Sequence, residues 1–80
     1  MIVSLKGKIQ ELLINRLVLD VNGVGYECLI TIKSYEELVN KKDQEVTILT
    51  YHHITDSSQS LFGFIDNKEK EIFKLLISVS

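Results

Sequence analysis

The residues best placed to do chemistry lie in the segment ITDSSQSLFGF, between Ile54 and Phe64. Six polar residues, from Thr55 to Ser60, separate two apolar runs, and one of the six, Asp56, is charged. Apolar runs on either side of a polar, turn-forming segment are typical of a two-stranded hairpin. The sequence therefore predicts a strand finger whose polar tip carries a single carboxylate.

Two adjacent histidines, His52 and His53, suggest a metal or acid–base site. Neighbouring strand residues point to opposite faces of a sheet, so the two imidazoles cannot both ligate one ion. Ser57 and Ser58 lie near the histidines, but serines at a turn tip are common turn residues rather than nucleophiles. We expect one packed and one solvated histidine, and no catalytic residue, metal or cofactor.

Charge and cysteine content argue against a self-sufficient nucleic-acid binder and against a reactive thiol. Nine basic and eleven acidic residues give a net charge of −2, whereas a self-sufficient nucleic-acid binder carries a basic footprint. This domain alone should therefore bind DNA poorly. The single cysteine, Cys28, lies inside the apolar run YECLITI, which indicates a buried structural thiol and fits a reducing, cytoplasmic setting.

Length and hydropathy indicate one small soluble domain. No stretch approaches the roughly 20 apolar residues of a membrane span, and MIVSLKGKIQELL lacks the features of a signal peptide. A chain of 80 residues without a disulfide framework has a thin core. We expect self-association and no membrane partner.

The segment RLVLDVNGVGYECLITI predicts a hairpin, with strands over Leu17–Val21 and Val24–Ile32. Its turn is Asn22-Gly23, because both central positions of a tight hairpin turn favour positive φ, which these residues tolerate best. Gly25 follows, and the lack of a side chain there suits a bulge or a close backbone approach. The apolar residues before this hairpin predict an earlier strand.

The rest of the chain predicts two helices and the strand EVTILTYHHI. Ser34 and Glu37 form a capping-box pattern for a short helix over Ser34–Val39. Asp66 and Glu69 form the same pattern for a helix over Asp66–Val79.

The apolar residues of these elements predict which side chains share a face. In the strand, Val46, Ile48 and Ile54 share one face and Leu49 and Tyr51 the other. In the second helix one apolar stripe is predicted to consist of Ile72, Phe73, Leu76 and Val79.

The order is therefore three strands, a helix, two strands and a final helix. A helix between the third and fourth of five strands is the arrangement of the OB-fold, a small Greek-key barrel. We expect a mainly β protein with the barrel over residues 1–64, the last helix over 65–80, and antiparallel pairing throughout.

Four aromatic residues, Tyr26, Tyr51, Phe62 and Phe64, leave two interpretations open. They can form the base-stacking platform that OB-folds use on single strands, or they can belong to the barrel core. The first interpretation makes the chain a general single-stranded nucleic-acid-binding module, which salt-dependent binding of oligonucleotides would reveal.

Three segments together resemble a known family. MIVSLKGKI opens the chain, LDVNGVGYE spans Leu19–Glu27, and LFGFIDNKEKEIFKLLISVS spans Leu61–Ser80. In combination they resemble the N-terminal domain of the RuvA family of Holliday-junction proteins over essentially the whole chain.

This resemblance implies a role in DNA recombination and repair. RuvA family members bind four-way DNA junctions as homotetramers and work with the RuvB motor, which hydrolyses ATP to move the branch point. In the family the N-terminal domain builds the tetramer centre, a second domain with helix-hairpin-helix motifs grips the phosphates, and a third contacts RuvB. The resemblance thus implies a non-catalytic subunit of a helicase complex.

The resemblance also implies a role for the polar finger. The family carries an acidic pin on a strand hairpin that projects into the junction centre, and ITDSSQSLFGF matches that hairpin. Asp56 falls at the first acidic position of the pin and Ser57 at the second. We therefore expect a pin with one carboxylate instead of the pair often found in the family.

Overall fold

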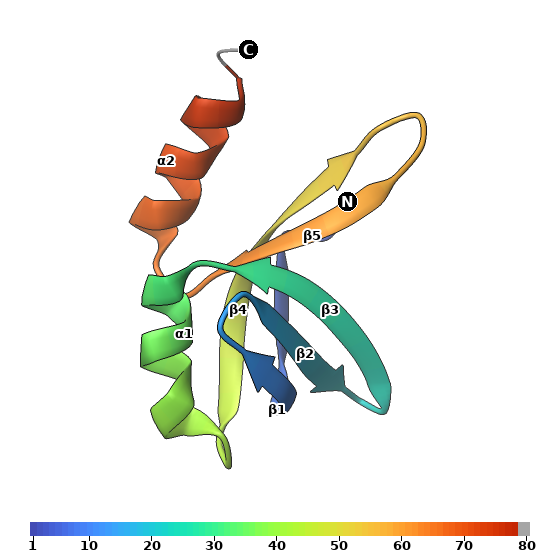
Figure 1. Cartoon of the computed structure of the whole chain (residues 1–80). Helices are drawn as coiled ribbons and strands as arrows, with labels where there is room; N and C mark the ends of the chain where they lie inside the picture. The colour runs from blue at the N-terminus through green and yellow to red at the C-terminus, as the bar shows by residue number, and fades with distance from the viewer. Residues whose placement is uncertain (79–80) are drawn as a thin grey trace.

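The computed structural model describes residues 1–78, so Val79 and Ser80, which the sequence analysis placed in the last helix, lie outside it. Within residues 1–78 the chain forms five strands, two helices and a 3₁₀ turn, and Figure 1 shows how they are arranged. In chain order these are β1 (Ser4–Leu13), β2 (Arg16–Val21), β3 (Val24–Ile30), α1 (Ile32–Leu38), η1 (Val39–Lys41), β4 (Glu45–Ile54), β5 (Gln59–Phe64) and α2 (Asn67–Ile77).

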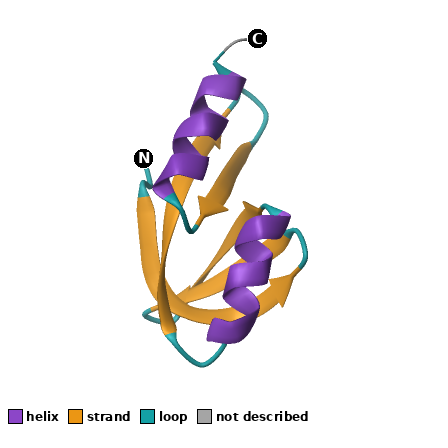
Figure 2. Ribbon diagram, turned by 90° about the vertical axis from the view of Figure 1, so that its left-hand side faces the viewer, coloured by secondary structure: helices purple, strands orange, loops and turns teal. Residues whose placement is uncertain are grey.

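The strands close into a barrel in the order β1-β2-β3-β5-β4. The predicted five-stranded barrel, with a helix between β3 and β4 and a helix at the end, is confirmed. Both helices lie on one side of the molecule, α1 beside the barrel and α2 along the β4–β5 hairpin (Figures 1 and 2).

The β1 strand pairs with two neighbours. Its first half, Ser4–Lys8, pairs with β4. Its second half, from Lys8 to Leu13, pairs with β2, and the register of that pairing shifts between Ile9 and Glu11. A bulge of this kind bends a strand and increases its twist. The bend lets β1 pair with β4 at one end and with β2 at the other.

The expectation of antiparallel pairing throughout was wrong at one place. β3 and β5 run parallel, with Leu29 opposite Phe62 and Ile30 opposite Gly63. The reason is topological. A closed ring of five strands contains five neighbouring pairs, and because this number is odd, the strand direction cannot reverse at every pair. One parallel pair is therefore required, and it falls where the chain has crossed over through α1.

The core lies inside the barrel. Strands β2, β3 and β4 each direct apolar side chains into it. Leu17, Leu19, Cys28 and Ile48 are fully buried there, and Leu38 of α1 joins them. Alternation along β2 and β4 produces this face, as expected for strands buried on one side.

The prediction for β4 was correct for Val46 and Ile48, which are buried. Ile54 continues the same alternation along β4 but is 55% exposed. Ile54 lies where the β4–β5 hairpin has left the barrel. The alternation of side chains continues there, but no core is present to bury the Ile54 side chain.

Two glycines accompany the β2–β3 hairpin. Asn22 and Gly23 have φ values of 53° and 91°, and the Gly23 N–H donates to Asp20 Oδ1 at 2.8 Å. At Gly25 the register between β2 and β3 is continuous, so there is no bulge. A Cβ at Gly25 would instead lie 3.2 Å from the Gln10 side-chain oxygen.

The first helix begins earlier than predicted. Thr31 is its N-cap, and the Thr31 hydroxyl accepts from the Ser34 N–H at 3.1 Å. Ser34 is thus inside α1 and 1% exposed, so it cannot cap the helix or form a box with Glu37. Thr31 is the N-cap because its backbone is extended and lies directly before the first helical turn.

The second helix begins at the predicted cap. The Asp66 carboxylate accepts from the Lys68 N–H at 2.9 Å, and this bond, followed by Lys33, lowers the pKa of Asp66. The reciprocal bond expected of Glu69 does not form, because its carboxylate bonds to two hydroxyls of α1.

The apolar stripe predicted for α2 packs only in part: among its described members Phe73 alone is half-buried, and Val79 lies outside the described residues. Ile72 and Leu76 are 52% and 70% exposed, whereas Glu69, Phe73 and Ile77 are half-buried. These three positions are spaced by four residues, which places them on one helix face.

We predict that Gly7→Ala destabilises the barrel. A Cβ at Gly7 would lie 2.2 Å from the Asp20 carbonyl oxygen, and because the obstacle is backbone, β1 and β2 must separate. The expected loss is about 3 kcal/mol of unfolding free energy in a urea titration. The control is Gly23→Ala, which meets no atom within 4 Å but has positive φ and should cost about 1 kcal/mol. Equal losses would contradict the packing argument.

Candidate nucleic-acid interface

The β4–β5 hairpin extends beyond the barrel and forms an arm (Figure 1). In the sheet β5 pairs with β3 at Phe62 and Gly63, while its pairing with β4 continues outward to Ile54 opposite Gln59. The outer half of the hairpin is therefore supported mainly by its own ladder, on the side away from the barrel core.

Hydrogen bonds close the tip of this arm. The Thr55 N–H donates to the Ser58 carbonyl at 2.8 Å, and the Ser58 N–H donates to the Thr55 hydroxyl at 3.0 Å. The two hydroxyls also lie 2.9 Å apart. These bonds leave Asp56 and Ser57 as the two outermost residues of the turn.

Asp56 and Ser57 are both exposed. Within residues 1–78 the Asp56 carboxylate takes part in no hydrogen bond or ion pair. Its charge is therefore available to whatever approaches the tip, and Ser57 adds a hydroxyl but no charge beside it.

The two histidines lie on opposite faces of β4. His52 Nε2 lies 3.2 Å from Gln59 Oε1, whereas the His53 ring lies 6.2 Å from Tyr51 and 6.3 Å from Phe62 between ring centroids. The expectation of one packed and one solvated histidine was wrong, because both are half-buried. Among residues 1–78 no group of three potential metal ligands occurs.

A cleft of about 390 Å³ opens where β3 and β5 diverge. Its only carboxylate, from Glu27, is paired with Arg16, which also bonds to Glu11. The Glu27 carboxylate is therefore already paired, although it shares the Arg16 guanidinium with Glu11. The cleft is lined by Ile2, Glu27, Leu29, His52, Gln59, Ser60 and Leu61.

Phe73 of α2 is the centre of an aromatic cluster. Its ring centroid lies 5.8 Å from that of Tyr51, 4.8 Å from Phe62 and 5.3 Å from Phe64. Three of the four aromatics considered as a stacking platform thus pack against a helix instead of offering open faces to bases. This packing disfavours the single-strand stacking interpretation. The sequence analysis assigned Phe73 only to a helix stripe and missed this role.

Cys28 is fully buried in the core, as predicted. Burial, with a smaller contribution from the neighbouring Glu27 carboxylate, raises the pKa of its thiol to about 11. The thiol is therefore protonated at neutral pH and unsuited to nucleophilic chemistry.

Comparison with known families gives a match over residues 1–63 to the RuvA N-terminal domain. The chain belongs to the RuvA N-terminal domain family. The matched residues include the whole barrel up to Gly63 and thus the complete arm with Asp56 and Ser57 at its tip.

Individual relatives agree with this family. The chain is 47% identical over 79 residues to the Holliday junction branch migration complex subunit RuvA of Leptospira biflexa. It is 44% identical over 80 residues to the subunit of the same name from Flavobacterium psychrophilum, and 39% identical over 80 residues to that of Syntrophotalea carbinolica. It spans about 40% of the length of each of these relatives.

No helix within residues 1–78 is long and apolar enough to cross a membrane. The longest, α2, has 11 residues, about half of the roughly 20 that a span requires.

We predict that Cys28 resists alkylation in the folded protein. With a pKa near 11 instead of 9.0, the thiolate fraction at pH 8 falls about a hundredfold, so iodoacetamide should label the native chain at least that much more slowly than the urea-unfolded chain. Intact mass spectrometry over time measures both rates. Similar rates in the two states would show that the thiol is accessible and ionised.

Proposed function

We propose that this chain is the N-terminal domain of a RuvA-type subunit that binds four-way DNA junctions, and that Asp56 is its acidic pin. The observation that carries the proposal is the exposed carboxylate of Asp56, without a partner among residues 1–78, at the end of the projecting β4–β5 arm. Family membership and the names of the relatives, each a Holliday junction branch migration complex subunit, support it.

The pin acts by repulsion. A carboxylate about 6 Å from a backbone phosphate is repelled by roughly 0.7 kcal/mol in a water-like dielectric and by about 3 kcal/mol at an effective constant of 20. Four copies around a fourfold axis can steer strands apart at the junction centre. With Ser57 uncharged, each copy contributes one carboxylate.

Affinity for DNA comes from elsewhere in this proposal. A net charge of −2 is the wrong sign for holding phosphates. In a longer RuvA-type protein the helix-hairpin-helix segment that follows the domain grips the junction, and a RuvB-type motor supplies ATP hydrolysis. This domain is a non-catalytic guide for the strands.

The test is Asp56→Asn in a full-length RuvA-type protein that carries this domain. Because the change removes an unfavourable interaction and no contact, junction affinity should stay level or rise, by roughly threefold for each 0.7 kcal/mol of repulsion removed. Branch migration should change, since strands are no longer steered. Gel-shift titration on a four-way junction and a strand-exchange assay measure the two effects.

The matched control is Asp43→Asn, which removes an exposed aspartate at the opposite end of β4 and should alter neither measurement. Ser57→Asp should have the reverse effect and lower affinity, most clearly at low salt where screening is weak. If Asp56→Asn binds the junction several-fold more weakly with its fold intact, Asp56 is a contact to the DNA partner and the pin is refuted.

We also propose that the domain assembles into a homotetramer. The core is small, and large apolar side chains remain exposed, among them Ile32 at 62%, Leu75 at 66% and Leu76 at 70%. Burying such side chains between copies would add stability that the thin core cannot supply.

Sedimentation velocity of the 80-residue chain at high micromolar concentration should show species larger than a monomer. Replacing Leu75 and Leu76 by Gln should reduce the larger species if α2 contributes to the contact, and replacing the exposed Glu71 by Gln should not. A purely monomeric profile of the unmodified chain would argue that assembly depends on segments beyond this domain.

A further inference from the structure

The second helix is held to the barrel by few contacts. No residue of α2 is fully buried, and the packing of Phe73 against Tyr51, Phe62 and Phe64 is its main apolar anchor. Apolar packing is non-directional, so one ring in an aromatic cluster fixes where a helix lies but leaves it free to pivot. A second point of attachment is needed to set its direction.

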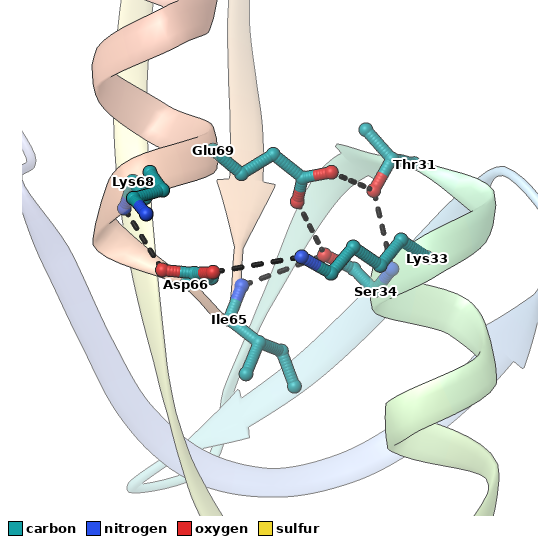
Figure 3. A network of polar contacts seen from close by, with 7 residues as sticks. All are labelled: Thr31, Lys33, Ser34, Ile65, Asp66, Lys68 and Glu69. Atoms are coloured by element: carbon teal, nitrogen blue, oxygen red, sulfur yellow. Dashed lines mark hydrogen bonds and ion pairs between the residues drawn. The ribbon is translucent and has the colours of Figure 1, made fainter.

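Glu69 lies one turn before Phe73, on the same face of α2. Its carboxylate accepts two hydrogen bonds, from the Thr31 hydroxyl at 3.0 Å and from the Ser34 hydroxyl at 3.2 Å (Figure 3). Each oxygen has a different donor, and the donors are three residues apart in the chain. A two-point bond of this kind restricts orientation as well as distance, and the negative charge strengthens it.

Both hydroxyls are held in place by α1 and its surroundings. The Thr31 hydroxyl accepts from the Ser34 N–H at 3.1 Å, and the Ser34 hydroxyl accepts from the Ile65 N–H at 3.4 Å. Ser34 is 1% exposed, so its hydroxyl has little access to water as an alternative partner. These bonds connect the start of α1, the end of β5 and the first turn of α2.

The other polar links to α2 are weaker. Lys33 Nζ lies 3.5 Å from Asp66 Oδ2, with both side chains substantially exposed, and Lys70 Nζ donates to the Val3 carbonyl at 3.4 Å. Exposed ion pairs of flexible side chains contribute little.

We infer that Glu69, held by the Thr31 and Ser34 hydroxyls, is the positioning residue that sets the direction in which α2 leaves the barrel. A chain that continues beyond α2 takes its initial direction from this clamp. Within a capping box Glu69 would serve only its own helix, whereas here it joins α2 to α1.

The experiment uses NMR on the ¹⁵N-labelled 80-residue chain. In the unmodified chain one alignment tensor should fit the residual dipolar couplings of barrel and α2 alike. In Glu69→Ala the α2 couplings should shrink and no longer fit, and α2 order parameters should fall from about 0.85 towards 0.6, while its helical chemical shifts persist. The matched control is Glu71→Ala, the same change at an exposed position of the same helix whose partner is Lys74.

Ser34→Ala separates positioning from helix capping. It removes one hydroxyl of the clamp without changing any residue of α2, so it should reproduce the loosening in part, even if Glu69→Ala unwinds the helix. If α2 keeps its couplings and order parameters in both Glu69→Ala and Ser34→Ala, the clamp does not set its direction and the inference is overturned.

One consequence depends on the proposed function. In a full-length RuvA-type protein, Glu69→Ala should weaken junction binding several-fold because the phosphate-gripping segment follows α2, and Glu71→Ala should not. Loosened couplings with unchanged junction affinity would uphold the clamp and overturn only this consequence, so the two failures can be told apart.

Discussion

The path of β1 across two neighbouring strands is the constraint on which the rest of the barrel depends. The strand must pair with β4 over its first half and with β2 over its second, and it bends where the register shifts. At Gly7 the backbone of β1 lies so close to the Asp20 carbonyl that no side chain fits. The parallel pairing of β3 with β5 then closes the ring, and closure buries Leu17, Leu19 and Ile48 in one small core.

Closure also explains why the candidate site lies on an arm. β3 and β5 meet over two residue pairs, and beyond them the β4–β5 ladder continues without a third strand. The core therefore stabilises the base of the hairpin, while the tip depends on the Thr55–Ser58 bonds. Asp56 at this tip is exposed to water, where a carboxylate needs no partner.

The two helices also differ in how far the core supports them. Leu38 anchors α1 directly in the core, whereas α2 rests on the surface through the Phe73 cluster and the Glu69 clamp. Apolar contact supplies attachment, and charge-assisted hydrogen bonds supply direction. A helix held in this manner can be redirected by single substitutions without loss of the barrel, and Ser34 provides such a position away from the helix itself.

Local features of this protein followed from the sequence by itself. These features depend on the preferences of a few neighbouring residues. They are the polar run around Asp56, the alternation in β4 and the Asp66 cap. The tertiary structure alone decided features that join distant segments. A pattern cannot say that Glu69 bonds to hydroxyls more than thirty residues away or that Ile54 lies beyond the reach of the core. Burial and long-range hydrogen bonds depend on which surfaces meet, and that is determined only when the ring of strands has closed.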